Sequence, residues 1–183
     1  MKFKFGIVFL ILITATSCLK KTVLETTFDC SNSFSFSDTK KVKDIKKNFT
    51  ISIPENWKTQ LYYDEFQSDI FTADTTKNLS NTYIIDTSWK LGELNLSKEF
   101  ETKLISSTDM DVVNSKFENI QEKPAFWYLL KGKNKGFDYQ VLQIFVKTSV
   151  DTYLEIKTEV YGNKNVEERF CESMQIIKSI QFI

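Results

Sequence analysis

The chain has 183 residues, with 24 lysines and arginines, 24 aspartates and glutamates, and no histidine. The absence of histidine excludes Ser-His-Asp catalysis, Cys-His catalysis and every His-ligated metal site. Because the charges balance, long-range electrostatics provides no reason to bind nucleic acid.

The first 17 residues have the three parts of a bacterial export signal. Lys2 and Lys4 form the positive start, residues 5–13 are uncharged and almost entirely apolar, and residues 14–17 are small. The apolar run is shorter than the roughly 20 residues of a membrane-spanning helix. The following Cys18 makes this region resemble a bacterial lipobox, although Ala15 stands where leucine is usual. We expect cleavage before Cys18 and lipidation of Cys18; an uncleaved anchor or a plain secretory signal are the alternatives.

Lipidation would attach the protein to a membrane through several acyl chains, since a single chain binds only marginally. Position 19 is Leu rather than Asp, which by analogy with Gram-negative lipoproteins argues against retention at the inner membrane. We therefore expect a location in the cell envelope, on the outer membrane and facing the periplasm. The mature chain would carry a net charge of −2 and has the length of one domain.

Two cysteines remain beside Cys18. Cys30 and Cys171 form an even number in an oxidising compartment, where a disulfide between them would tie the start of the mature chain to its last helix. In the chain-entropy model, closing so long a loop is worth about 4–5 kcal/mol. Two buried free thiols are the alternative.

The first half of the mature chain predicts a polar lead-in followed by strands. Residues 18–46 are rich in Thr, Ser, Asp and Lys and predict a tether and approach segment, so the domain would span residues 47–183. Apolar Phe49, Ile51 and Ile53 alternate with polar residues, which indicates a half-buried strand. Further strands are expected over residues 61–63, 69–73 and 82–89.

The second half predicts a helix, several strands and a last helix. Ser97 is expected to cap the first helix and Asn165 the second, whose buried stripe would be Val166, Phe170, Met174 and Ile177. Between them we expect strands over residues 117–121 and 124–130, a turn at 131–136, and a hairpin of 137–148 with 152–161. Residues 179–183 would return as an edge strand. This order predicts an α+β fold, an antiparallel β-sheet flanked by helices.

Several segments resemble those of PsbP-like domains. Asn48–Lys58 (NFTISIPENWK) resembles their opening strand, Gln121–Ala125 their turn into the central hairpins, Tyr153–Ile156 the strand before their final helix, and Met174–Phe182 their closing helix and strand. The chain thus resembles a lipoprotein of the Bacteroidetes type with a PsbP-like domain. The resemblance implies an α/β/α sandwich and a binding or assembly role, and it carries no catalytic motif to this chain.

Charged candidates for a site all have a plain surface alternative. Lys131, Lys133 and Lys135 could contact a lipid headgroup or an acidic partner, or simply form a solvated turn, and their loop lacks the pattern of a phosphate loop. Two acidic sets could hold calcium, or be ordinary surface acids, and neither has an EF-hand pattern: Asp109, Asp111 and Glu118; and Asp64, Glu65 and Asp69. We therefore expect no metal site.

Aromatic residues are the remaining candidates. Trp57 and Trp127 are the two that we expect at a ligand groove, if one exists, with core packing as the alternative. Trp89 could share either role. Phe126 and Tyr128 should lie on one face of their strand and Trp127 on the other.

The sequence favours a membrane-anchored, non-catalytic binding or accessory module. We expect no cofactor, an unidentified protein partner, and no nucleic-acid partner. A lipoprotein that neutralises an effector (an immunity-type protein) and a hydrolase that uses carboxylates are the alternatives.

Overall fold

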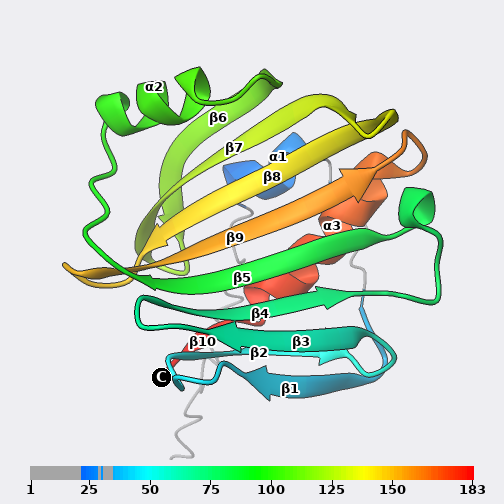
Figure 1. The fold of residues 1–183 in the computed structure, drawn as a ribbon, viewed down its shortest axis with the longest axis horizontal. Coiled ribbons are helices and arrows are strands. Elements are labelled where there is room, and N and C mark those ends of the chain that lie inside the picture. The colour runs from blue at the N-terminus through cyan, green and yellow to red at the C-terminus, as the bar shows by residue number, and fades with distance from the viewer. Residues whose placement is uncertain (1–21, 29, 31–34) are drawn as a thin grey trace, which may run out of the picture.

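The computed structural model describes residues 22–28, 30 and 35–183, in which β-strands predominate (Figure 1). The main sheet is antiparallel throughout, with seven strands in the order β3-β4-β5-β9-β8-β7-β6. Its strands are β3 (Lys58–Tyr63), β4 (Gln67–Ala73), β5 (Tyr83–Leu91), β6 (Asp111–Ile120), β7 (Lys123–Asn134), β8 (Phe137–Lys147) and β9 (Thr152–Tyr161).

A smaller antiparallel sheet and short helices complete the described part of the chain. The small sheet has the order β1-β2-β10. Its strands and the helices are β1 (Thr39–Lys43), β2 (Phe49–Pro54), β10 (Gln181–Phe182), α1 (Val23–Thr27), α2 (Lys98–Ser106), α3 (Val166–Lys178) and the 3₁₀ turn η1 (Leu79–Asn81). None of the described helices is long and apolar enough to cross a membrane.

The larger core lies on one face of the main sheet. In β9, alternate residues Leu154, Ile156 and Val160 are buried, as the two-residue period of a strand requires. They pack with Phe170 and Met174 of α3, and residues of α1 and β2 join the same cluster. Figure 1 shows α1 and α3 behind the main sheet. These elements therefore cover most of this face, whereas Leu61 and Tyr63 of β3, on the same face, stay exposed.

The expected antiparallel sheet is confirmed, whereas flanking helices describe the fold only in part. The small sheet shares the covered face with α1 and α3, and α2 covers only part of the opposite face. The fold is thus mainly β. The long hairpin of β8 and β9, the Ser97 cap of α2 and the buried stripe of α3 lie where the sequence places them.

The segment before residue 47 is more structured than a tether. Leu24 and Phe28 of the α1 region are buried, and β1 pairs with β2 along its whole length. Apolar side chains that reach the core account for this, because burying them removes apolar surface from water. Residues 1–17 and Cys18, the expected signal and lipid site, lie outside the described residues.

Two local details also differ from expectation. Asn165 adopts a left-handed backbone with a φ of 50° and forms no side-chain cap, so α3 begins without the expected cap. The turn expected at residues 131–136 contains only Lys135 and Gly136, both with positive φ, because β7 continues to Asn134. A two-residue turn with positive φ at both positions fits the twist of a hairpin.

Candidate functional site: the open half of the main sheet

The second face of the main sheet is divided into an apolar half and a polar half. Over β6, β7 and β8, side chains such as Phe126, Tyr128 and Phe145 form a second core with Phe100 and Leu104 of α2. Over β4, β5 and β9 no helix covers the face turned toward the viewer in Figure 1. We call this uncovered part the open half.

Strand register brings the polar side chains of the open half together. Asp69 on β4 pairs with Ser88 on β5, which pairs with Glu155 on β9. In the next row, Asp86 on β5 pairs with Lys157 on β9. Directly paired residues on one face have Cβ atoms about 4.5–5.5 Å apart, so these side chains form one contiguous surface.

A chain of hydrogen bonds crosses this surface toward the apolar half. The Lys90 ammonium donates to Glu155 Oε2 at 2.5 Å, and the Gln143 amide donates to the other oxygen of Glu155. The Tyr128 hydroxyl donates to Gln143 Oε1 at 2.7 Å. Beside this chain, Lys157 pairs with Glu159 at 2.9 Å. Both lysines of the open half are thus already neutralised by glutamates.

Asp69 and Asp86 are the exception in this network. Within the described residues neither has an ion-pair partner within 4 Å, although Gln67 donates to Asp69 Oδ2 at 3.2 Å. Burial raises the pKa of both carboxyls above the usual value, more than the nearby lysines lower it. The charge of Glu155 also raises the pKa of both carboxyls, and the charge of Asp69 raises that of Asp86 further.

These residues enclose a polar hollow of about 250 Å³. It is lined by Gln67, Asp69, Asp86, Ser88, Lys90, Glu155 and Lys157. The two carboxyls without an ion-pair partner lie next to lysines that have one. The hollow is therefore suited to a cationic group, which would pair with Asp69 and Asp86 and offset part of the cost of their burial.

The two tryptophans expected at a groove are core residues. Trp57 is 5% exposed and lies 4.9 Å from the Tyr83 ring, centroid to centroid. Trp127 is fully buried, and its indole N–H donates to Glu118 at 2.6 Å. Both belong to the larger core: Trp127 lies on the face of β7 that carries this core, and Trp57 reaches it from the turn between β2 and β3. The groove expectation is thus corrected to the alternative, core packing.

The other aromatic candidates divide between the two faces. Trp89 packs against the larger core, whereas Phe126 and Tyr128 belong to the second core, on the opposite face from Trp127. Only Tyr128 reaches the open half, through Gln143. Burial raises the pKa of Tyr128 to about 12, so its hydroxyl stays protonated.

The acidic sets do not form calcium sites. Asp111 and Glu118 lie seven residues apart on β6, about 23 Å along a strand, and Glu118 is bonded to Trp127. Asp64 caps the turn after β3 by accepting hydrogen bonds from the Phe66 and Gln67 amides. Asp69 lines the hollow instead, and Asp64 does not. No group of three or more potential metal ligands occurs in the described part of the chain.

The lysines expected at a loop tip belong largely to a strand. Lys131 and Lys133 pair with Gln140 and Asp138 across β7 and β8, and only Lys135 lies in the turn. All are on the surface or close to it. They do not converge on a site.

The sequence patterns did not predict most of the residues that line the hollow. Asp86 and Lys90, like Glu155 and Lys157, alternate with buried residues in their strands, which indicates a face that does not join the core. This alternation can be read from the sequence. The pairing of strands cannot, because β5 pairs with β9 across more than 60 residues of chain.

No family model matches this chain, and no curated protein does. Solved structures with a similar fold exist. A solution structure of cyanobacterial PsbP (CyanoP) from Synechocystis sp. PCC 6803 superposes with a TM-score of 0.57 and 7% identity, over 83% of this chain and 96% of that one. The PsbP-like fold expected from sequence is thereby confirmed.

Two further structures have the same fold. The Ran-binding protein Mog1p of Saccharomyces cerevisiae gives a TM-score of 0.52 and 11% identity, over 79% of this chain and 95% of that one. A protein of Bacteroides thetaiotaomicron VPI-5482 gives 0.51 and 13%, over 79% of this chain. The match covers 48% of the Bacteroides chain, so this chain spans about half of its length.

Proposed function

We propose that this protein is a non-catalytic binding module of the cell envelope, held by lipid on Cys18 at the periplasmic side of the outer membrane. It binds a protein partner through the open half of the main sheet. The observation that carries this proposal is the polar hollow with two half-buried carboxyls, Asp69 and Asp86, that have no ion-pair partner among the described residues. The lipobox-like residues before Cys18 support the anchor.

The chemistry of the hollow defines the kind of partner. A lysine or arginine side chain from the partner would pair with Asp69 and Asp86, while Lys90 and Lys157 keep their own glutamates. Charged pairs in a water-excluding contact give specificity more than affinity. The same fold in a protein described as Ran-binding supports a protein partner in general.

Quantitative cross-linking in the native cells tests the binding proposal. Wild-type protein is compared with the double variant Asp69→Asn, Asp86→Asn and with Asp111→Asn, an acid exposed at the start of β6. We expect one partner to be lost at least about tenfold with the double variant, as loss of a buried charge pair implies, and retained with Asp111→Asn. Equal recovery with all three proteins would reject the open half as the binding surface.

The anchor is tested separately. Mass spectrometry of the mature N-terminus should find an acylated Cys18, and Cys18→Ala should move the protein from the membrane fraction to the soluble fraction. An unmodified Cys18 would reject the lipid anchor and leave the binding surface to be judged by the cross-linking.

A second function is favoured by one specific observation. Asp69 and Asp86 are neighbouring carboxyls, and both pKa values are raised, which is the property of a general acid in carboxylate-based hydrolysis. The test is hydrolysis of a panel of glycosides and esters. Activity in the wild type that disappears in Asp86→Asn would show that the protein is a hydrolase rather than a binding module. A single stoichiometric toxin in the cross-linked complex would instead identify the immunity-type role.

A further inference from the structure

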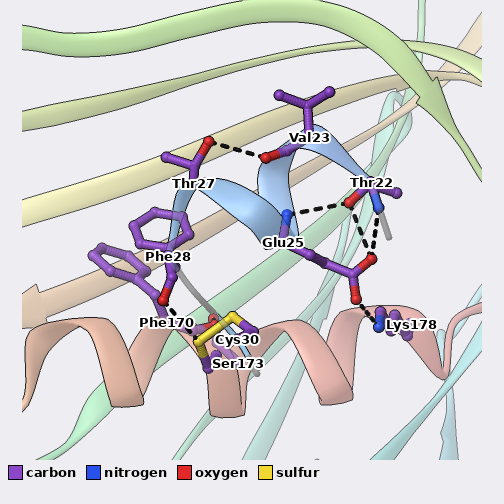
Figure 2. Close-up of a disulfide and its surroundings, with 10 residues drawn as sticks. Thr22, Val23, Glu25, Thr27, Phe28, Cys30, Phe170, Ser173 and Lys178 are labelled. Atoms are coloured by element: carbon purple, nitrogen blue, oxygen red, sulfur yellow. Dashed lines mark hydrogen bonds and ion pairs between the residues drawn. A yellow bond between two sulfur atoms is a disulfide. The ribbon is translucent and has the colours of Figure 1, made fainter. Parts of the chain in front are cut away.

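The first described helix is fastened to the domain at its beginning. The Val23 and Leu24 amides donate to the two oxygens of Glu118 on β6, at 3.0 and 3.1 Å. Glu25 forms an ion pair with Lys178 at the end of α3, and Glu25 and Thr22 close a capping box. Figure 2 shows the box and the ion pair next to α3. The beginning of α1 is thus held in place.

The end of the same segment is held even more firmly. Leu24 and Phe28 are 3% and 6% exposed, and the Phe28 ring lies 4.8 Å from that of Phe170 on α3. Cys30 and Cys171 are joined by a disulfide, drawn in yellow in Figure 2. A helix of five residues would not be stable alone, so these contacts make α1 part of the domain.

The distance from the lipid site to this fixed point is short. Four peptide steps separate Cys18 from Thr22, and whatever their conformation they span at most about 14 Å. We propose that this short connection holds α1 and the neighbouring β6 edge of the sheet against the lipid surface, and directs the polar hollow away from it. This rests on the lipidation of Cys18 that we propose above.

The membrane-facing surface follows from the contacts around Thr22. It comprises Val23, Gln121 and Lys178; the Gln121 amide donates to the Lys178 carbonyl, and Val23 is 37% exposed. We call it the anchor-side surface. The occupant is the lipid bilayer, because a connection of this length leaves no space for another macromolecule between Thr22 and the lipid headgroups.

The hollow is remote from the anchor-side surface in two directions. α1 packs on the covered face of the sheet, whereas Asp86 and Glu155 lie on the opposite face. Across the sheet, β9 and β4 are three and five strands away from β6, or about 14 and 24 Å. A partner in the periplasm could therefore reach the hollow while the lipid is inserted.

Energy transfer from single labels to an acceptor lipid tests this orientation. The lipidated, disulfide-bonded protein is placed in vesicles of phosphatidylethanolamine and phosphatidylglycerol that carry the acceptor on the headgroup. With Cys18 acylated and Cys30 bonded to Cys171, an introduced cysteine is the one free thiol. The near label is Val23→Cys, and the far label is Gln60→Cys on β3, six strands from β6 or about 29 Å.

We expect transfer from position 23 to exceed that from position 60 by at least about twofold, because the labels differ in height by roughly the width of the sheet. Insertion of a 20-residue Gly-Ser segment after Lys20 is the matched control. Its random-coil span of about 25 Å should abolish the difference.

Equal transfer from the two labels without the insertion would overturn the orientation. So would a difference that survives the insertion, because it would then arise from adhesion of the domain rather than from the short connection. Mass spectrometry of each sample reports whether Cys18 carries lipid. A failure of lipidation is thereby distinguished from a failure of the orientation.

Discussion

Cys30 and Cys171 are 141 positions apart in sequence, yet their Cα atoms lie 5.4 Å apart and their sulfurs are bonded. This bond connects the segment after α1 to the middle of α3. It therefore fixes the segment around α1 to the hydrophobic core that the last helix covers.

Replacing both cysteines by serine should lower the free energy of unfolding by about 2–5 kcal/mol, because the unfolded chain regains the freedom that a long closed loop removes. Urea unfolding followed by tryptophan fluorescence measures the change. Wild-type protein under reducing conditions is the control and should match the double variant. An unchanged midpoint would contradict a structural role for the disulfide.

Glu118→Ala should loosen α1 more than the rest of the protein. The substitution removes the acceptor for the Val23 and Leu24 amides and leaves the buried Trp127 N–H without its partner. An unsatisfied buried donor costs about 1–3 kcal/mol. Hydrogen exchange should therefore accelerate over residues 23–28, with Glu122→Ala on the neighbouring turn as the control. Uniform acceleration over the whole chain would show instead that Glu118 stabilises the core in general.

Arg169→Met should destabilise the protein strongly. Arg169 is 4% exposed and donates to the carbonyls of Thr82, Tyr161 and Lys164 at 2.7, 2.9 and 2.7 Å. Methionine fills similar space but leaves those acceptors without a donor, at a cost of about 1–3 kcal/mol for each one that stays buried.

Arg169→Lys separates charge from geometry at this position. A lysine has one ammonium and cannot reproduce the planar fork of the guanidinium, so we expect stability between that of wild type and that of Arg169→Met. Urea midpoints of the three proteins measure this order. A Lys variant as stable as wild type would mean that the charge alone matters.

Asp86→Asn should stabilise the protein at neutral pH. Burial raises the pKa of Asp86 in the folded state above its unfolded value. As pH rises, the unfolded chain loses this proton first, so ionisation weakens folding at and above neutral pH. Because asparagine cannot ionise, the melting temperature of the Asp86→Asn variant should exceed that of wild type at pH 7.

The same effect should disappear in acid. Below about pH 4, the usual range of an aspartate carboxyl, Asp86 is protonated in both states, and the advantage of Asp86→Asn should vanish. Asp111→Asn should show little change at either pH. A melting temperature below wild type at pH 7 would mean that Asp86 is held by a stabilising interaction instead.

Local patterns in the sequence predicted most of the individual elements. The alternation in Phe49–Ile53 and the spacing of Phe170, Met174 and Ile177 lie in the residues themselves, because a strand repeats every 2 residues and a helix every 3.6. Ser97 caps α2 for the same local reason. Asn165 forms no cap because its backbone is left-handed rather than in the extended conformation that a capping residue adopts.

Only the tertiary structure decided what these elements form together. Trp57 and Trp127 became core residues, and Asp69, Asp86, Glu155 and Lys157 became one hollow, because the register of β4, β5 and β9 sets which side chains are neighbours. Register depends on contacts between residues far apart in sequence, which no local period encodes. By itself the sequence determined which side chains share a face of each strand. Long-range strand pairing determined which of those side chains become neighbours in the folded protein.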